Sequence, residues 1–328
     1  TSPLQKSRVS LFLTLGGLFL VLAGSSLFLG AADLGDGSLR QTLLELRGLR
    51  LMAAALIGSS LAVAGVMMQG LFRNPLAEPG VIGTNAGAML GGSVALIFFE
   101  TVRPPVPAAV MLPLGCVGGG MLSLWIVLMV ARKSRDTIGV LLAGVIISML
   151  LTSLGAFLSA MVQDDWQLAR ALMQFSLGRI DTKGLGHVAL ATPLWLGGIG
   201  AAWWWGRQLD VLLAGEDEAR SLGIDLDGLR RWLIVWSTLL VAGAVAIGGA
   251  ISFVGLVVPH FLRGLVGAHH RRLVPFAAVG GALFVLACDV VVRILPTKGE
   301  LPLGVITGLV GAPLFLLMLV RARREALL

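Results

Sequence analysis

The chain has 328 residues, of which 56% are hydrophobic and only 13% are charged, and its formal net charge is +7. Soluble domains carry about a quarter charged residues, so this composition excludes an ordinary soluble protein and indicates an all-α membrane protein. The positive charge does not require a nucleic-acid partner, because Lys and Arg accumulate on the cytoplasmic loops of membrane proteins. Cys116 and Cys288 both lie in apolar runs, which indicates neither a disulfide framework nor a metal site.

Apolar runs divide the chain into ten expected transmembrane helices that form a single domain, residues 1–328. The first run, residues 9–32, is too long for a signal peptide and lacks a cleavage pattern, so we expect a retained helix. The other clear full-length runs are 51–71, 81–99, 108–131, 137–161, 188–206, 273–292 and 302–320. Residues 39–50 are amphipathic, and residues 168–177 are expected to form a short surface helix.

Residues 232–262 contain no Lys, Arg, Asp or Glu. A helix of this length would measure about 46 Å, which is too long for one span and too short for two full ones. We expect breaks at Gly248-Gly249 and at Pro259, and therefore one full helix followed by a half-length helix that ends near Gly267. Non-helical backbone at that depth must be buried in protein or line a cavity.

The longest charge-rich segment is residues 207–231. Its pattern predicts two short helices that meet at Gly223, with an apolar face that includes Leu212, Leu222 and Leu226. A solvated linker would satisfy the composition. The alternative is a docking surface for a cytoplasmic partner, since a few polar residues would suffice to connect two spans.

The distribution of positive charge sets the orientation. With both termini in the cytoplasm, sixteen of the 25 Lys and Arg residues lie on the inner side and nine on the outer side. This arrangement satisfies the positive-inside rule and the inverted one does not. The segment 207–231 then faces the cytoplasm.

The sequence offers little chemistry of its own. It contains neither a GxxxxGK[ST] loop for nucleotide phosphates nor an HExxH motif. An intramembrane protease could use His260, although a structural hydrogen bond is the commoner role. A secondary transporter could use Asp289, although an ion pair with Arg293, four residues later, is the commoner role. We therefore expect a passive pathway, not an enzyme, that an external motor drives.

Several blocks of the sequence together resemble one family. They are Arg47-Gly48-Leu49-Arg50, Gln69 with residues 73–80 (RNPLAEPG), residues 253–260 (FVGLVVPH), residues 287–293, residues 300–304 and residues 311–313. From Arg47 onward the chain is similar to the permeases of bacterial ABC importers for iron siderophores, haem and vitamin B12. Where the family often has Arg-Leu-Pro-Arg, this chain has Gly48-Leu49 between two arginines, which predicts a looser turn there.

The resemblance implies ten transmembrane helices per subunit in the bacterial inner membrane, with a homodimer interface that forms the pathway. It also implies two cytoplasmic ATPase subunits, which use ATP and Mg, and a periplasmic binding protein; this chain itself is expected to bind no cofactor. The resemblance places an inner gate at Asn74, Leu76, Asp136 and Thr137. It places ATPase coupling at Glu216, Asp217, Glu218, Arg220, Ser221, Leu222 and Gly223, and binding-protein docking at Arg47, Arg50 and Arg293.

The sequence indicates the class of cargo through its positive residues near the expected outer mouth. Arg170, Arg179 and Lys183 are expected near the outer mouth, where cations suit an anionic cargo. Haem, with two propionates and a large apolar face, fits a pathway lined by the Met- and Leu-rich second and fifth helices. The chain looks closest to the haem importers, while ferric siderophores and corrinoids remain open.

Overall fold

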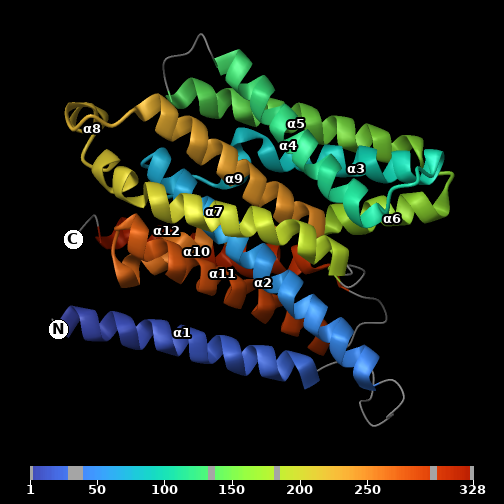
Figure 1. Cartoon of the computed structure of the whole chain (residues 1–328), viewed down its shortest axis with the longest axis horizontal. Coiled ribbons are helices and arrows are strands. Elements are labelled where there is room, and N and C mark those ends of the chain that lie inside the picture. Colours follow the sequence, from blue (N-terminus) through green and yellow to red (C-terminus); the bar gives the residue numbers. More distant parts are fainter. Residues whose placement is uncertain (1–2, 29–39, 132–136, 181–184, 296–300, 326–328) are drawn as a thin grey trace.

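The computed structural model describes residues 3–28, 40–131, 137–180, 185–295 and 301–325. Every regular element in these ranges is helical, and most helices run along the long axis of the molecule (Figure 1). In chain order the elements are α1 Pro3–Phe28, α2 Arg40–Leu71, η1 Pro79–Ile82, α3 Thr84–Val102, α4 Ala108–Ala131, α5 Thr137–Met161, α6 Trp166–Leu177, α7 Leu185–Leu212, α8 Glu216–Ser221, α9 Leu226–Gly248, α10 Val254–Val266, α11 His270–Ile294 and α12 Leu303–Glu325.

Nine helices of the described chain are long and apolar enough to cross a membrane: α1 to α5, α7, α9, α11 and α12. Helix α10 has 13 residues, about 20 Å, and is too short to do so alone. The predicted set of ten, with one half-length helix, is confirmed. Gly249 and Phe253 separate α9 from α10 with φ angles of 67° each. The break expected at Pro259 was wrong, since α10 continues through it; membrane helices tolerate proline where neighbouring groups compensate for its missing N–H.

Helix α2 differs from the prediction at its start. The amphipathic residues 39–50 and the apolar run 51–71 were expected as separate elements, but Arg40–Leu71 is one continuous helix of 32 residues. Arg47 and Arg50 therefore lie on helical backbone, and the looser turn expected at Gly48 was wrong. Glycine, unlike the proline of the family pattern, keeps the backbone N–H that helix propagation needs.

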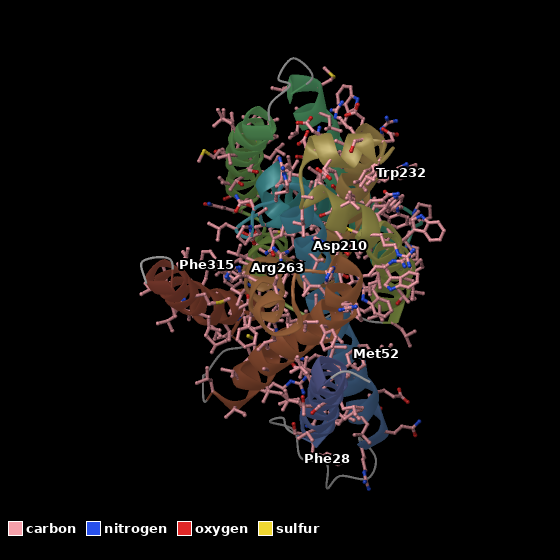
Figure 2. All side chains as sticks on the ribbon, turned by 90° about the vertical axis from the view of Figure 1, so that its left-hand side faces the viewer. Phe28, Met52, Asp210, Trp232, Arg263 and Phe315 are labelled. Carbon is pink, nitrogen blue, oxygen red and sulfur yellow. The ribbon has the colours of Figure 1, made fainter. Side chains whose placement is uncertain are left out.

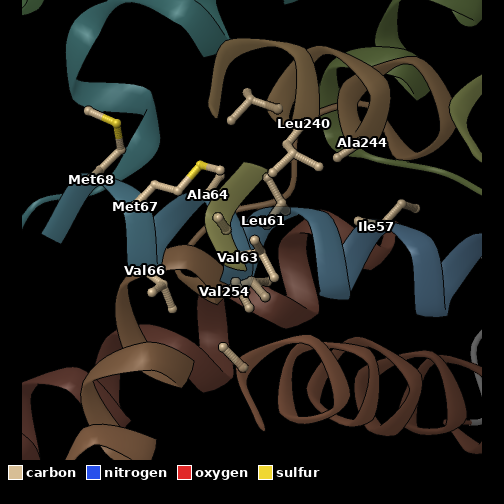
Figure 3. Close-up of a cluster of buried hydrophobic side chains, with 14 of the residues drawn as sticks. Ile57, Leu61, Val63, Ala64, Val66, Met67, Met68, Leu240, Ala244 and Val254 are labelled. Atoms are coloured by element: carbon tan, nitrogen blue, oxygen red, sulfur yellow. The ribbon is translucent and has the colours of Figure 1, made fainter. Parts of the chain in front are cut away.

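Helix α2 is also the centre of the fold. Most of its residues from Ala53 to Leu71 are buried against α7, α9, α10 and α11. Figure 3 shows Ile57, Leu61 and Met67 of α2 in the same buried cluster as Leu240 of α9. The close approach depends on glycine, because a Cβ atom on Gly58 would overlap the carbonyl group of Gly281 in α11.

The two ends of the molecule carry different elements. The first turn of α1, the last turn of α12 and helix α8 lie at one end (Figure 1). Helix α6 and the start of α2 lie at the other end. Asp165 caps α6 by accepting hydrogen bonds from the backbone N–H groups of Gln167 and Leu168. The short helix predicted at 168–177 is confirmed, and its position at the membrane surface stays a prediction.

Candidate functional site

Helix α8, Glu216–Ser221, lies in the middle of the segment 207–231 that was predicted to couple the chain to a partner. The segment 207–231 does not contain two short helices; residues up to Leu212 continue α7, and α9 already begins at Leu226. Glu216, Asp217 and Glu218 occupy the first turn of α8, where carboxylates stabilise the positive end of the helix dipole. Ala219 is fully buried. Five of the seven predicted coupling residues therefore lie on α8, and Leu222 and Gly223 follow it directly.

Glu216 connects α8 to α9 and to the loop after α2. Its Oε1 atom lies 2.5 Å from Nη2 of Arg230 in α9 and 3.7 Å from Nη2 of Arg73. Arg73 follows α2 directly and adopts a φ of 49°, in the left-handed region that non-glycine residues rarely occupy. The sequence analysis assigned Glu216 to coupling but missed both arginine partners, because neither is near Glu216 in the chain.

The predicted inner gate begins one residue after Arg73. Asn74 accepts a hydrogen bond at its Oδ1 atom from the backbone N–H of Leu76, at 2.9 Å. Its backbone carbonyl accepts another from Ala77. The side chain of Leu76 is 44% exposed. Asp136 lies outside the described residues, and Thr137 begins α5 with a side chain that is also outside them.

Glu78, in the same loop, is a partly buried carboxyl that the sequence pattern did not single out. It accepts a hydrogen bond from the backbone N–H of Phe253, the strained residue that precedes α10. Burial raises the pKa of Glu78 above its usual range, and this hydrogen bond only partly offsets the effect. The loop after α2 is thereby joined to the break between α9 and α10.

The three predicted docking arginines form one cluster around Asp289. Arg50 contacts Oδ1 of Asp289 at 2.8 Å and Arg293 contacts Oδ2 at 2.6 Å, while Asp289 is fully buried. The predicted ion pair between Asp289 and Arg293 is confirmed. Arg293 also donates to the carbonyl of Ser26, and Arg47 donates to the carbonyl of Leu27. The cluster therefore fastens the C-terminal end of α1 to α2 and α11.

The predicted cations of the outer mouth lie at the α6 end. With its amide oriented to satisfy both neighbours, Gln174 accepts from Nη1 of Arg179 at 2.7 Å and from Nε of Arg170 at 3.3 Å. The structure thus brings Arg170 and Arg179 together. Lys183 lies outside the described residues.

A cavity of about 450 Å³ lies between α3, α5 and α6. Its lining is uncharged and combines aliphatic side chains with polar ones. The polar lining residues are Asn85, Ser93, Ser148, Thr152, Ser159 and Ser176. Two of these hydroxyls are locally satisfied, since Ser148 donates to the carbonyl of Gly144 and Ser159 to that of Gly155. A bulky, largely apolar molecule with peripheral hydrogen-bonding groups would suit this surface.

His260, which was expected to form a structural hydrogen bond, and His270 differ in their contacts. The hydrogen bond expected of His260 is not formed through its buried Nδ1 atom, which has no partner among the described residues. Its neighbour one turn along α10 is Arg263, whose nitrogen atoms offer only donors. His270 pairs instead with Asp210, whose Oδ1 accepts from the backbone N–H at 2.7 Å and lies 2.8 Å from the ring Nδ1. This contact joins α7 to α11 and was not predicted.

Residues 9–321 match the FecCD transport family. The chain belongs to the FecCD transport family. A vitamin B12 import system permease protein of Vibrio cholerae is 38% identical over 95% of this chain and 92% of its own length. A hemin transport system permease protein of Yersinia pestis is 35% identical over 98% of this chain and 99% of its own length.

A solved structure of a metal-chelate type ABC transporter in an inward-facing conformation covers 95% of this chain, with a TM-score of 0.85 and 30% identity. These similarities make the chain a multi-pass permease subunit of an ABC importer, in which a separate subunit hydrolyses ATP. The alternatives of a secondary transporter and of an intramembrane enzyme are therefore excluded as the main function.

Proposed function

We propose that two copies of this chain form the pathway of an ATP-driven importer that moves haem from the periplasm to the cytoplasm by alternating access. The observation that carries the proposal is the cavity between α3, α5 and α6, which is large, uncharged and lined by both hydroxyl and aliphatic groups. Relatives of this chain are named for vitamin B12, hemin and ferric dicitrate import. All three cargoes are bulky metal chelates.

The cytoplasmic side is assigned to the end that carries α8. The Lys and Arg bias of the sequence supports this orientation, and the first turn of α1 and the last turn of α12 lie at the same end (Figure 1). Glu216, Asp217 and Glu218 then face the partner ATPases, with Leu222 as a 66% exposed apolar contact. The loop that holds Asn74 and Leu76 would close the inner end of the pathway, opposite Asp136 and Thr137.

The homodimer interface is assigned to the cavity side of α5. Thr152 and Ser153 of this helix are exposed in the single chain. Polar side chains inside a membrane span rarely face lipid and usually face protein or an aqueous pathway. A second copy placed against this side would enclose the cavity from both halves.

The outer arginines are assigned to binding-protein docking, but they differ in role. The side chain of Arg50 is 23% exposed, whereas that of Arg293 is 8% exposed and bonded to Asp289 and to Ser26. Arg50 would therefore meet an acidic group of the binding protein. Arg47 and Arg293 would hold Arg50 and α1 in position for that contact.

Haem is the first candidate cargo because Arg170 and Arg179 provide two neighbouring cations, which match the two propionates of haem. The second candidate is a corrinoid, because the cavity itself is uncharged and its hydroxyls suit amide groups. The two candidates differ in their dependence on Arg170 and Arg179.

The test is uptake into vesicles that contain this chain, its ATPase and its binding protein, with haem, a ferric siderophore and cobalamin supplied in turn. For a haem importer, the double variant R170Q/R179Q lowers haem uptake about tenfold or more, the effect of losing one charge-assisted hydrogen bond. Binding-protein association should remain unchanged, which separates this effect from docking. Cobalamin uptake that exceeds haem uptake in the wild type would contradict the haem assignment and support the corrinoid one.

A further inference from the structure

Helix α7 presents three successive tryptophans near the end that carries α8. Successive residues of a helix are 100° apart, so Trp203, Trp204 and Trp205 point in three directions. The ring of Trp203 lies under the guanidinium of Arg271 in α11, 4.3 Å from its centroid, and the ring of Trp205 stacks on that of Trp232 in α9 at 6.2 Å. Trp204 lies between these two contacts and is 68% exposed. The three helices thus share one aromatic surface.

Arginines lie next to this surface, toward the end of the molecule that carries α8. Arg207 follows Trp203 by one helical turn and is exposed, and Arg272 follows Arg271 and is also exposed. The side chain of Arg271 is fixed, since its Nε donates to the carbonyl of Trp203 at 3.2 Å and its backbone packs against Gly206. We define the Trp–Arg face as Trp203, Trp204, Arg207, Trp232, Arg271 and Arg272.

The positive charge of the Trp–Arg face has no counter-charge within the part of the chain that the structure describes. No described carboxylate lies within 4.0 Å of a guanidinium nitrogen of Arg207, Arg271 or Arg272. The nearest acid along α7 is Asp210, which is already engaged by His270 at 2.8 Å and by His269 at 3.6 Å. The face therefore offers three cations for an external anion.

The location of the face indicates lipid. Trp232 lies on the side of the molecule opposite Phe315 of α12 (Figure 2), and no residue of the Trp–Arg face lines the cavity. Tryptophan is enriched where the hydrocarbon core of a membrane meets the headgroups, because its ring is apolar and its N–H is polar. Arginine forms bidentate hydrogen bonds with phosphate. Exposed tryptophans can pack against the acyl chains of a phospholipid. The neighbouring arginines, which have no carboxylate partner among the described residues, can bind the phosphate of the same lipid.

We propose that the Trp–Arg face binds the headgroup phosphate of an anionic phospholipid in the leaflet next to the coupling segment. That this leaflet is the cytoplasmic one rests on the proposed orientation; the binding itself does not. The acyl chains would pack on Trp204 and Trp232, and the phosphate would bridge Arg207 and Arg271. Since α7 continues from Arg207 to Leu212 and then into α8, the lipid would fix the base of the surface that meets the ATPase.

The test uses the full chain alone, in nanodiscs that contain phosphatidylcholine with a small fraction of brominated phosphatidylglycerol or, in a matched sample, brominated phosphatidylcholine. Bromine quenches tryptophan fluorescence at contact. Wild-type protein should be quenched more by the anionic lipid at equal mole fraction. The variant R207Q/R271Q/R272Q should lower this preference about tenfold or more, since each cation near an anionic surface contributes about a fivefold factor.

The matched control is R40Q/R103Q, which removes two exposed arginines from the opposite end of the molecule and should keep the preference. Equal monodispersity of all three proteins in detergent shows that they are folded. Equal quenching by the two lipids in the wild type, or an unchanged preference in the triple variant, would overturn the proposal. None of these readings involves cargo or transport, so they fail independently of the proposed function.

Discussion

Arg50 and Asp289 are 239 residues apart in the chain and form an ion pair of 2.8 Å at one end of the α2–α11 contact. Asp289 is fully buried and also holds Arg293 at 2.6 Å. One carboxylate thus bridges two guanidinium groups. The arrangement connects three helices, because Arg293 in turn donates to the carbonyl of Ser26 in α1.

Replacement of Asp289 by Asn should destabilise the protein strongly. The change leaves two partly buried arginines without a counter-charge, and breaking a buried pair in this way typically costs about 3–5 kcal/mol. Thermal unfolding in detergent measures the effect. The control is E45Q, which alters an exposed carboxylate whose contact is Gln41. In an R50Q background the cost of D289N should fall; an equal cost in both backgrounds would contradict the coupling of the two side chains.

Replacement of Glu216 by Gln should separate coupling from stability. Exposed ion pairs contribute about 0–1 kcal/mol, so the melting temperature should change little. The loss of the Arg73 and Arg230 contacts should nevertheless uncouple α8 from the loop that holds Asn74. We expect lower cargo-stimulated ATPase activity in the assembled transporter. E45Q is the control, because Glu45 is an exposed carboxylate outside the segment 207–231 and contacts Gln41. Equal activity of both variants would contradict the link.

Gly65 should not tolerate alanine. A Cβ atom at this position would overlap the carbonyl oxygen of Gly255 in α10, and overpacking of this kind costs about 1–3 kcal/mol. It would also move the carbonyl groups to which Gln69 donates. Gly264 of α10 has open space around it, so G264A should be neutral or stabilising. Thermal unfolding compares the two variants, and similar effects would contradict the described packing of α2 on α10.

Glu78 should make stability depend on pH. Burial raises the pKa of this carboxyl in the folded protein, so the folded state binds the proton more tightly than the unfolded state does. The stabilising protonation is fully present below the unfolded pKa, near 4.5, and is lost as the pH rises through the raised folded value. E78Q should therefore be more stable than wild type at pH 7, and the difference should shrink on acidification. A difference that is constant across this pH range would contradict the assignment.

The sequence predicted most of the helices because long apolar runs and their breaks are local signals. The half-length α10 could be inferred from the length of one uncharged run alone. The predicted start of α2 was wrong because an amphipathic stretch can continue into an apolar one within a single helix, here with Arg47 as the one buried residue before Ala53. The split within residues 207–231 was wrong because Leu212 and Leu226 are buried as ends of α7 and α9.

The local sequence pattern predicted only one of the contacts around Asp289. The Asp289–Arg293 pair is four residues apart on a helix and was foreseen, whereas Arg50–Asp289 depends on how α2 packs against α11. The pairs Glu216–Arg73 and Asp210–His270 likewise join distant segments. The resemblance to a family singled out Arg50 and Glu216, but not the contacts that these residues make.

The central claim is that an external ATPase, acting through α8, drives cargo through this chain. ATP-dependent haem uptake into vesicles tests it most directly, with wild type compared with the triple variant E216K/D217K/E218K. The account predicts uptake that requires the ATPase subunit and ATP in the wild type. It predicts little uptake and weak ATPase binding in the triple variant, with an unchanged melting temperature. Cargo uptake driven by an ion gradient without the ATPase, or full activity of the triple variant, would contradict the claim.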